Sequence, residues 1–113
     1  MPITDERAAG RAFLKLLYGD DYYPDRLVDK GRDILVRLCE RIEAERPADV
    51  EAFYALTHAA TEEFNTLQEE FWAADSEIET VARDEIAMDF WFIAETYGFE
   101  DADLEEVVEP RDW

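Results

Sequence analysis

Apolar side chains recur every three or four residues along two long stretches of this chain, from Val50 to Phe71 and from Ile78 to Tyr97. This spacing matches the 3.6-residue turn of an α-helix and places each apolar set on one helical face. The connection at residues 73–75 is short, so we expect the two helices to pack side by side and antiparallel. The pair predicts the structural centre of the fold.

Helix signals cover most of the remaining chain. Thr4 or Asp5 can cap a first helix that ends at Gly19 and buries Phe13, Leu14, Leu16 and Leu17. A second helix is expected to begin at Pro24 and end before Pro47, with Gly31 marking a kink or close packing. Further signals are the cap Asp49, the capping box Ser76 and Glu79, the stop Gly98, and Asp101 as cap of a short last helix ending at Pro110.

No segment shows the period-two pattern of a strand or a hairpin turn dipeptide. The sequence therefore predicts an all-α fold, a compact bundle of four main helices plus a short C-terminal helix. We expect residues 1–113 to form a single helical domain. We also expect Trp113 to dock onto the bundle, because burying a Trp side chain stabilises the folded state by roughly a few kcal/mol.

The charge is strongly negative and unevenly distributed. The 113 residues contain 30 acids and 11 bases, a net charge of −19, and residues 47–113 contribute −18 of it with Arg83 and Arg111 as their two bases. Such a chain lacks the cations that bind nucleic acid or an anionic membrane surface, so neither is an expected partner. The acidic side chains either provide solubility or adaptation to a salty cytosol, or they form a surface that attracts a basic protein.

The expected location is the cytoplasm. The first residues lack the basic and apolar regions of a signal peptide, and the most apolar run, residues 86–94, is too short to span a membrane. Cys39 is the one cysteine, which excludes an internal disulfide.

Catalytic chemistry is not expected. Cys39 falls beside the apolar face of its helix, where thiols are usually inert, and no phosphate loop or nucleophile elbow is present. His58, Glu62, Glu85 and Asp89 could form a carboxylate-rich metal site, but the chain has one histidine and no Glu-x-x-His motif. We therefore predict no catalytic residue, no metal and no cofactor.

One face of the helix at residues 50–71 is polar but uncharged near neutral pH. It comprises Tyr54, His58, Thr61, Asn65, Gln68 and Trp72. A solvated face of this acidic chain would carry more charge, so the stripe predicts a covered face, packed by another part of the chain or lining a binding groove. Internal packing is the favoured interpretation, because buried polar groups generally find partners inside a fold.

Asp89 is the single charge within the apolar run 86–94, and a buried carboxylate needs a partner. The antiparallel register of the two long helices offers His58, Thr61 and Tyr54 as donors, and an arginine of the less acidic N-terminal half is the rival. A His58–Asp89 pair is the leading expectation, with a structural role.

Several stretches resemble a known family. They are Asp21 to Asp25, Leu27 to Gly31, Tyr54 to Glu62, Gly98 to Asp103 and the ending Pro110 to Trp113. They are similar to small acidic bacterial proteins known only as a domain of unknown function. The resemblance covers nearly the whole chain and implies a cytoplasmic helical domain without residue roles.

A shorter likeness involves Tyr22, Tyr23 and Pro24, which lie among acids. They are similar to the paired tyrosines with which helical colicin immunity proteins bind their toxic nucleases. In those proteins the pair follows three helices, whereas here it follows one, so neither tyrosine takes over a role from this likeness alone.

These observations predict a non-enzymatic interaction protein, with a basic protein as the possible partner. The alternative is an immunity- or inhibitor-type protein whose acidic half blocks a basic enzyme such as a nuclease toxin. A carboxylate-rich metal-binding protein is a further alternative. The sequence leaves the partner's identity and the oligomeric state open.

Overall fold

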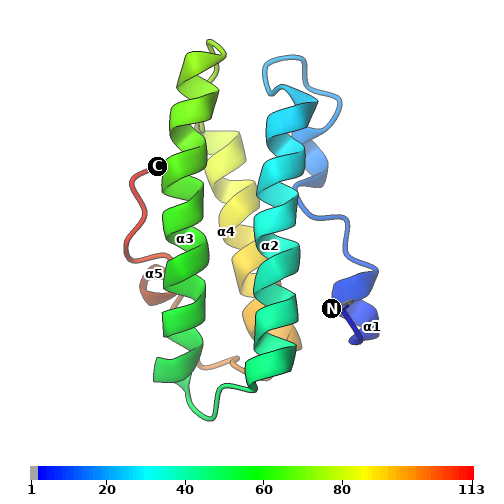
Figure 1. The fold of residues 1–113 in the computed structure, drawn as a ribbon, viewed down its shortest axis with the longest axis vertical. Helices are drawn as coiled ribbons and strands as arrows, with labels where there is room; N and C mark the ends of the chain where they lie inside the picture. The colour runs from blue at the N-terminus through cyan, green and yellow to red at the C-terminus, as the bar shows by residue number, and fades with distance from the viewer. Residues whose placement is uncertain (1–2) are drawn as a thin grey trace.

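In the view of Figure 1, the three long helices run down, up and down again, and they are the helices that the apolar periodicity predicts. The computed structural model describes residues 3–113, with α2 at Asp25–Glu45, α3 at Val50–Ala73 and α4 at Thr80–Thr96. α2 and α3 lie side by side and antiparallel, with α4 behind them and antiparallel to α3 (Figure 1). The described residues contain no strand, so the all-α prediction is confirmed.

The helix ends follow local chemistry at most of the predicted positions. The Asp49 side chain accepts a hydrogen bond from Ala52 N at 2.8 Å and caps α3. Gly98, at a φ of 86°, ends the α4 turn in a conformation that favours glycine. The predicted Ser76–Glu79 capping box is wrong, because Ser76 Oγ donates to Tyr22 O at 2.7 Å and joins two loops instead.

Aromatic rings fill the centre of the bundle. Phe64 of α3 is 1% exposed, and its ring centroid lies 6.0 Å from those of Phe90 and Trp113. The docking predicted for Trp113 is confirmed, since this residue is 7% exposed. Gly31 permits the close packing, because a Cβ atom there would lie 2.9 Å from Leu14 Cδ1.

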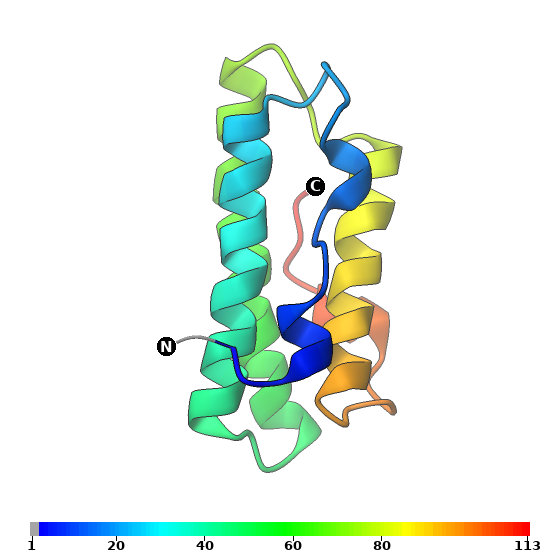
Figure 2. The same cartoon turned by 90° about the vertical axis from the view of Figure 1, so that its right-hand side faces the viewer.

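The N-terminal part is not the helix that its sequence predicts. It forms a short α1 at Glu6–Ala9 and a 3-10 turn η1 at Lys15–Leu17, joined by irregular chain that runs beside α4 (Figure 2). Leu14 adopts a left-handed φ of 58°, and Leu16, predicted to be buried, is 64% exposed. The described part of the bundle thus has three long helices, and this N-terminal segment, with its short α1 and η1, takes the place of the fourth, so the predicted four-helix arrangement holds in outline.

The C-terminal part packs on the opposite side. The last helix, α5, spans Leu104–Val107 and is capped by Asp103, not by the predicted Asp101. Beyond it, the chain runs back along α3 to Trp113 (Figure 1). Within residues 3–113, none of the helices combines the length and apolarity needed to cross a membrane.

Candidate functional site

The polar stripe of α3 fastens the C-terminal segment to the bundle. Its side chains bond to main-chain groups of residues 103–112 rather than to side chains. The pairs are Tyr54 Oη with Asp103 N (3.0 Å), His58 Nε2 with Glu106 O (2.6 Å), Asn65 Nδ2 with Pro110 O (2.9 Å), Asn65 Oδ1 with Asp112 N (2.7 Å) and Gln68 Nε2 with Asp112 O (3.1 Å). Most of the stripe is thus packed internally, with Tyr54, His58 and Asn65 occupied within the fold, whereas Trp72 at its end is 51% exposed.

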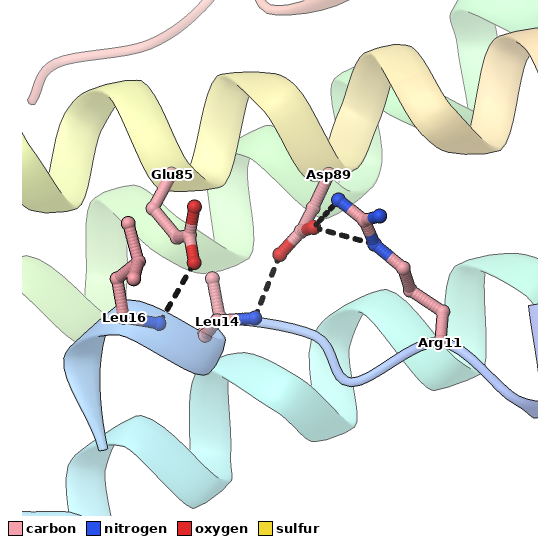
Figure 3. A network of polar contacts seen from close by, with 5 residues as sticks. All are labelled: Arg11, Leu14, Leu16, Glu85 and Asp89. Atoms are coloured by element: carbon pink, nitrogen blue, oxygen red, sulfur yellow. Dashed lines mark hydrogen bonds and ion pairs between the residues drawn. The ribbon is translucent and has the colours of Figure 1, made fainter. Parts of the chain in front are cut away.

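Asp89 is buried, as its apolar surroundings imply, but His58 is not its partner. Asp89 is 1% exposed, and its Oδ1 accepts from Arg11 Nη2 at 3.0 Å and from Arg11 Nε at 3.2 Å, while Oδ2 accepts from Leu14 N at 2.7 Å (Figure 3). The predicted His58–Asp89 pair is wrong because the two side chains face different segments, α5 and the N-terminal segment. The rival expectation of an N-terminal arginine describes the observed bond.

Opposing effects act on the Asp89 carboxyl group. Burial raises its pKa because it disfavours the charged form, whereas the Leu14 N–H and the Arg11 guanidinium lower it. The net shift is upward. Figure 3 shows a second carboxylate of α4 beside this pair, Glu85, which accepts from Leu16 N at 2.8 Å.

A third carboxylate, Glu43 of α2, holds the beginning of the described chain. It accepts from Thr4 N at 2.8 Å, from Thr4 Oγ1 at 2.7 Å, from Asp5 N at 3.1 Å and from Tyr97 Oη. Burial acts to raise its pKa, but these hydrogen bonds stabilise the carboxylate and lower the pKa to about 2. The Asp89 and Glu85 carboxylates of α4 therefore satisfy Leu14 N and Leu16 N, which a continuous N-terminal helix would have bonded internally. Glu43 satisfies N–H groups at the start of the segment, which would lack an internal partner in such a helix as well.

The residues weighed for a metal or nucleophile are not brought together. Asp89 and Glu85 face the N-terminal segment, whereas His58 faces α5. The described part of the chain contains no group of three or more His, Cys, Asp or Glu side chains placed to hold a metal ion. Burial raises the pKa of the Cys39 thiol to about 12, so the thiol is protonated at neutral pH.

Two of the predicted binding residues remain open to solvent. Tyr22 is 39% and Trp72 is 51% exposed, and both lie at the end of the bundle where α2 begins and α3 ends (Figure 1). Tyr23 is different: it is 4% exposed, and its ring packs at 5.1 Å from Tyr22 and 6.3 Å from Phe71. Tyr23 therefore supports Tyr22 from within the core.

Carboxylates lie near the exposed ring of Tyr22, and further exposed acids share this end of the bundle with Trp72. Desolvation, followed by the carboxylates of Glu79 and Glu77, raises the pKa of Tyr22. We call this surface the acidic aromatic end. It comprises the exposed residues Asp20, Asp21, Tyr22, Trp72, Asp75, Glu77 and Glu79.

Most acids of the C-terminal half have no cationic partner among the residues that the structure describes. Of the 20 acids in residues 47–113, four form ion pairs with described residues. These are Glu63, Glu70, Asp89 and Glu95, and their partners all come from the first 46 residues. The negative potential of this half is therefore largely uncompensated.

Comparison with known proteins gives one match. A model described as a family of unknown function (DUF5713) covers residues 7–113. No curated protein and no solved structure matches the chain.

Proposed function

Because the chain belongs to this family of unknown function, we propose a function from its own surface: a non-enzymatic cytoplasmic protein that binds a basic partner protein through its acidic aromatic end. The observation that carries the proposal is the exposure of Tyr22 and Trp72 among carboxylates. The other aromatic and amide candidates, Tyr54, His58 and Asn65, already bond the C-terminal segment.

Aromatic side chains in this setting suit a protein interface. Trp and Tyr are enriched among the residues that contribute most binding energy, because a rigid ring buries a large area at small entropic cost. Tyr22 is held in place by its edge contact with the buried Tyr23. Trp72 stands on the last turn of α3, and a helix is a rigid support.

The surrounding acids supply the charge selectivity. A partner with basic side chains is attracted by the potential of the whole C-terminal half and accelerated toward it, most strongly at low salt. A nucleic acid is repelled by the same potential. A basic protein with an apolar patch therefore fits both components of the surface.

The experiment compares Tyr22→Ala and Trp72→Ala with the matched control Met88→Ala, which removes a side chain that is 56% exposed in the middle of α4. Cytosolic proteins cross-linked to the wild-type protein are identified, and the leading one is purified for calorimetric titration. We expect a basic partner whose affinity weakens with added salt. Each aromatic replacement should weaken binding by about tenfold or more, as at interface hot spots. A partner whose affinity ignores both replacements, or ignores salt, contradicts the proposal.

The Tyr22–Tyr23 pair favours one second candidate, an inhibitor of a basic enzyme. The exposed ring of Tyr22 lies at 5.1 Å from the buried ring of Tyr23, with Asp20, Asp21 and Glu79 nearby. An immunity-type protein would neutralise a basic nuclease by covering its cationic surface. Stoichiometric inhibition of the purified partner's nuclease activity, lost in Tyr22→Ala, distinguishes this function from simple binding.

A further inference from the structure

Both cations of the acidic C-terminal half line the same groove. Arg83 of α4 and Arg111 of the C-terminal segment are distant in sequence, but both border a groove of about 630 Å³ between α4 and the C-terminal segment. Four carboxylates line the same groove: Asp84, Glu105, Glu106 and Glu109.

The two guanidinium groups lack anionic partners. Among residues 3–113, neither Arg83 nor Arg111 forms an ion pair, although acids line the groove with them. Arg83 Nε is buried and has no hydrogen-bond acceptor within the described residues. A buried donor without an acceptor is unfavourable, so a ligand acceptor that reaches it would be stabilising. The guanidinium of Arg111 lies 5.7 Å from the centroid of the Trp113 ring.

Two arginines of another groove differ in this respect. In the groove between α2 and α3, Arg37 Nη2 is bonded to Glu63 Oε1 at 2.6 Å, and Arg41 Nε is bonded to Glu45 Oε2 at 3.0 Å. That groove therefore presents cations that are already paired. In the groove of Arg83 and Arg111, by contrast, neither cation has a carboxylate of residues 3–113 bonded to it.

We propose that the groove of Arg83 and Arg111 binds a small molecule that carries one oxyanion group, a carboxylate or a phosphate, together with an ammonium group. Guanidinium groups present N–H donors in the planar geometry that matches both oxyanions. The groove's four carboxylates would accept the ammonium group, and the strongly negative protein would repel a ligand that carries only negative charge. Arg83 also borders a smaller pocket with Glu77 and Glu79 of the acidic aromatic end, whereas the other residues that line the groove lie outside that end. The proposed binding does not depend on the function of the acidic aromatic end.

The experiment uses the full chain labelled with ¹⁵N and follows the indole N–H signal of Trp113, which reports on the ring beneath Arg111. The probes are O-phosphoethanolamine, with a phosphate and an ammonium group, and β-alanine, its carboxylate counterpart. Inorganic phosphate and ethylamine each supply one of the two charges. We expect a saturable shift with O-phosphoethanolamine or β-alanine at concentrations up to about 10 mM, and which of the two binds identifies the oxyanion.

Arg111→Gln and Arg83→Gln should each weaken this binding by about tenfold or more, because each removes a charged donor. Arg111 is exposed, so its replacement keeps the fold, and circular dichroism checks both variants. Arg37→Gln is the matched control and should leave the affinity unchanged. The proposal is overturned if neither two-charge probe gives a saturable shift, if inorganic phosphate binds as tightly as O-phosphoethanolamine, or if the two variants bind as the control does.

Discussion

Replacing Asp89 with Ala tests whether the irregular N-terminal segment is held by a buried carboxylate. The change removes the acceptor of the Leu14 N–H, which is bonded at 2.7 Å, and of the Arg11 guanidinium, bonded at 3.0 Å. An unsatisfied buried N–H costs about 1–3 kcal/mol. The Arg11 side chain is 35% exposed and can rehydrate, so its lost ion pair adds no more than about 1 kcal/mol. We expect Asp89→Ala to lower the free energy of unfolding by about 1–4 kcal/mol.

Asp89→Asn is the informative companion, because its amide oxygen can still accept from Leu14 N. It should cost about 1 kcal/mol, the contribution of the charge toward the partly exposed Arg11. Urea unfolding followed by circular dichroism measures both changes, and at constant m-value the midpoint of Asp89→Ala should fall by roughly 1–3 M. The reasoning is refuted if Asp89→Ala costs less than about 1 kcal/mol, or if Asp89→Asn is equally destabilising.

Three further predictions concern the core and the charges. Phe64→Ala should lower the free energy of unfolding by about 3–5 kcal/mol, because the ring is 1% exposed and packs between Phe90 and Trp113. An unchanged melting temperature would contradict a central role of Phe64 in the core. The pKa of Glu43 is lowered to about 2, so the stability that it contributes is present above about pH 4.5 and lost toward pH 2. The stability difference between the wild type and Glu43→Gln should therefore shrink over this range in calorimetric melts, and a constant difference would contradict the shift. The carboxylates in residues 47–113 repel one another, so the protein should become more stable with added salt at neutral pH and as the pH falls from 7 to 5. A melting temperature that does not change with salt, or that falls steadily as the pH is lowered from 7 to 5, would contradict this.

Local patterns predicted the long helices well, because the period of apolar residues is a property of each helix by itself. The cap at Asp49 and the stop at Gly98 are also local, and the structure contains both. The prediction of a helix in the N-terminal segment was wrong for the opposite reason, because the structure of this segment depends on distant residues. Its N–H groups bond to Glu43, Glu85 and Asp89, which lie 38 to 78 residues away in sequence. An apolar pattern of a few residues cannot reveal such partners.

The candidate site was partly accessible to the same reasoning. The uncharged stripe of α3 indicated a covered face, but the covering segment, residues 108–113, carries no periodic signal of its own. The antiparallel register matched levels along α3 and α4 without fixing which side of α4 Asp89 would face. The exposure of Tyr22 and Trp72, in contrast to that of Tyr23, depends on tertiary packing, so the sequence proposed all three alike.

The way in which the two terminal segments are attached determines which of their residues can be replaced without loss of the fold. Main-chain N–H groups of the N-terminal segment are hydrogen-bonded by Glu43, Glu85 and Asp89. Main-chain groups of the C-terminal segment are hydrogen-bonded by His58, Asn65 and Gln68. A main-chain carbonyl is present whatever side chain accompanies it, and a main-chain N–H is present in every residue except proline. The side chains at solvent-facing positions of the two segments can therefore be replaced, whereas the six residues of the long helices that bond these segments are constrained. A saturation mutagenesis library selected for folded protein should therefore show a permissive surface on both segments and intolerance at these six helical positions.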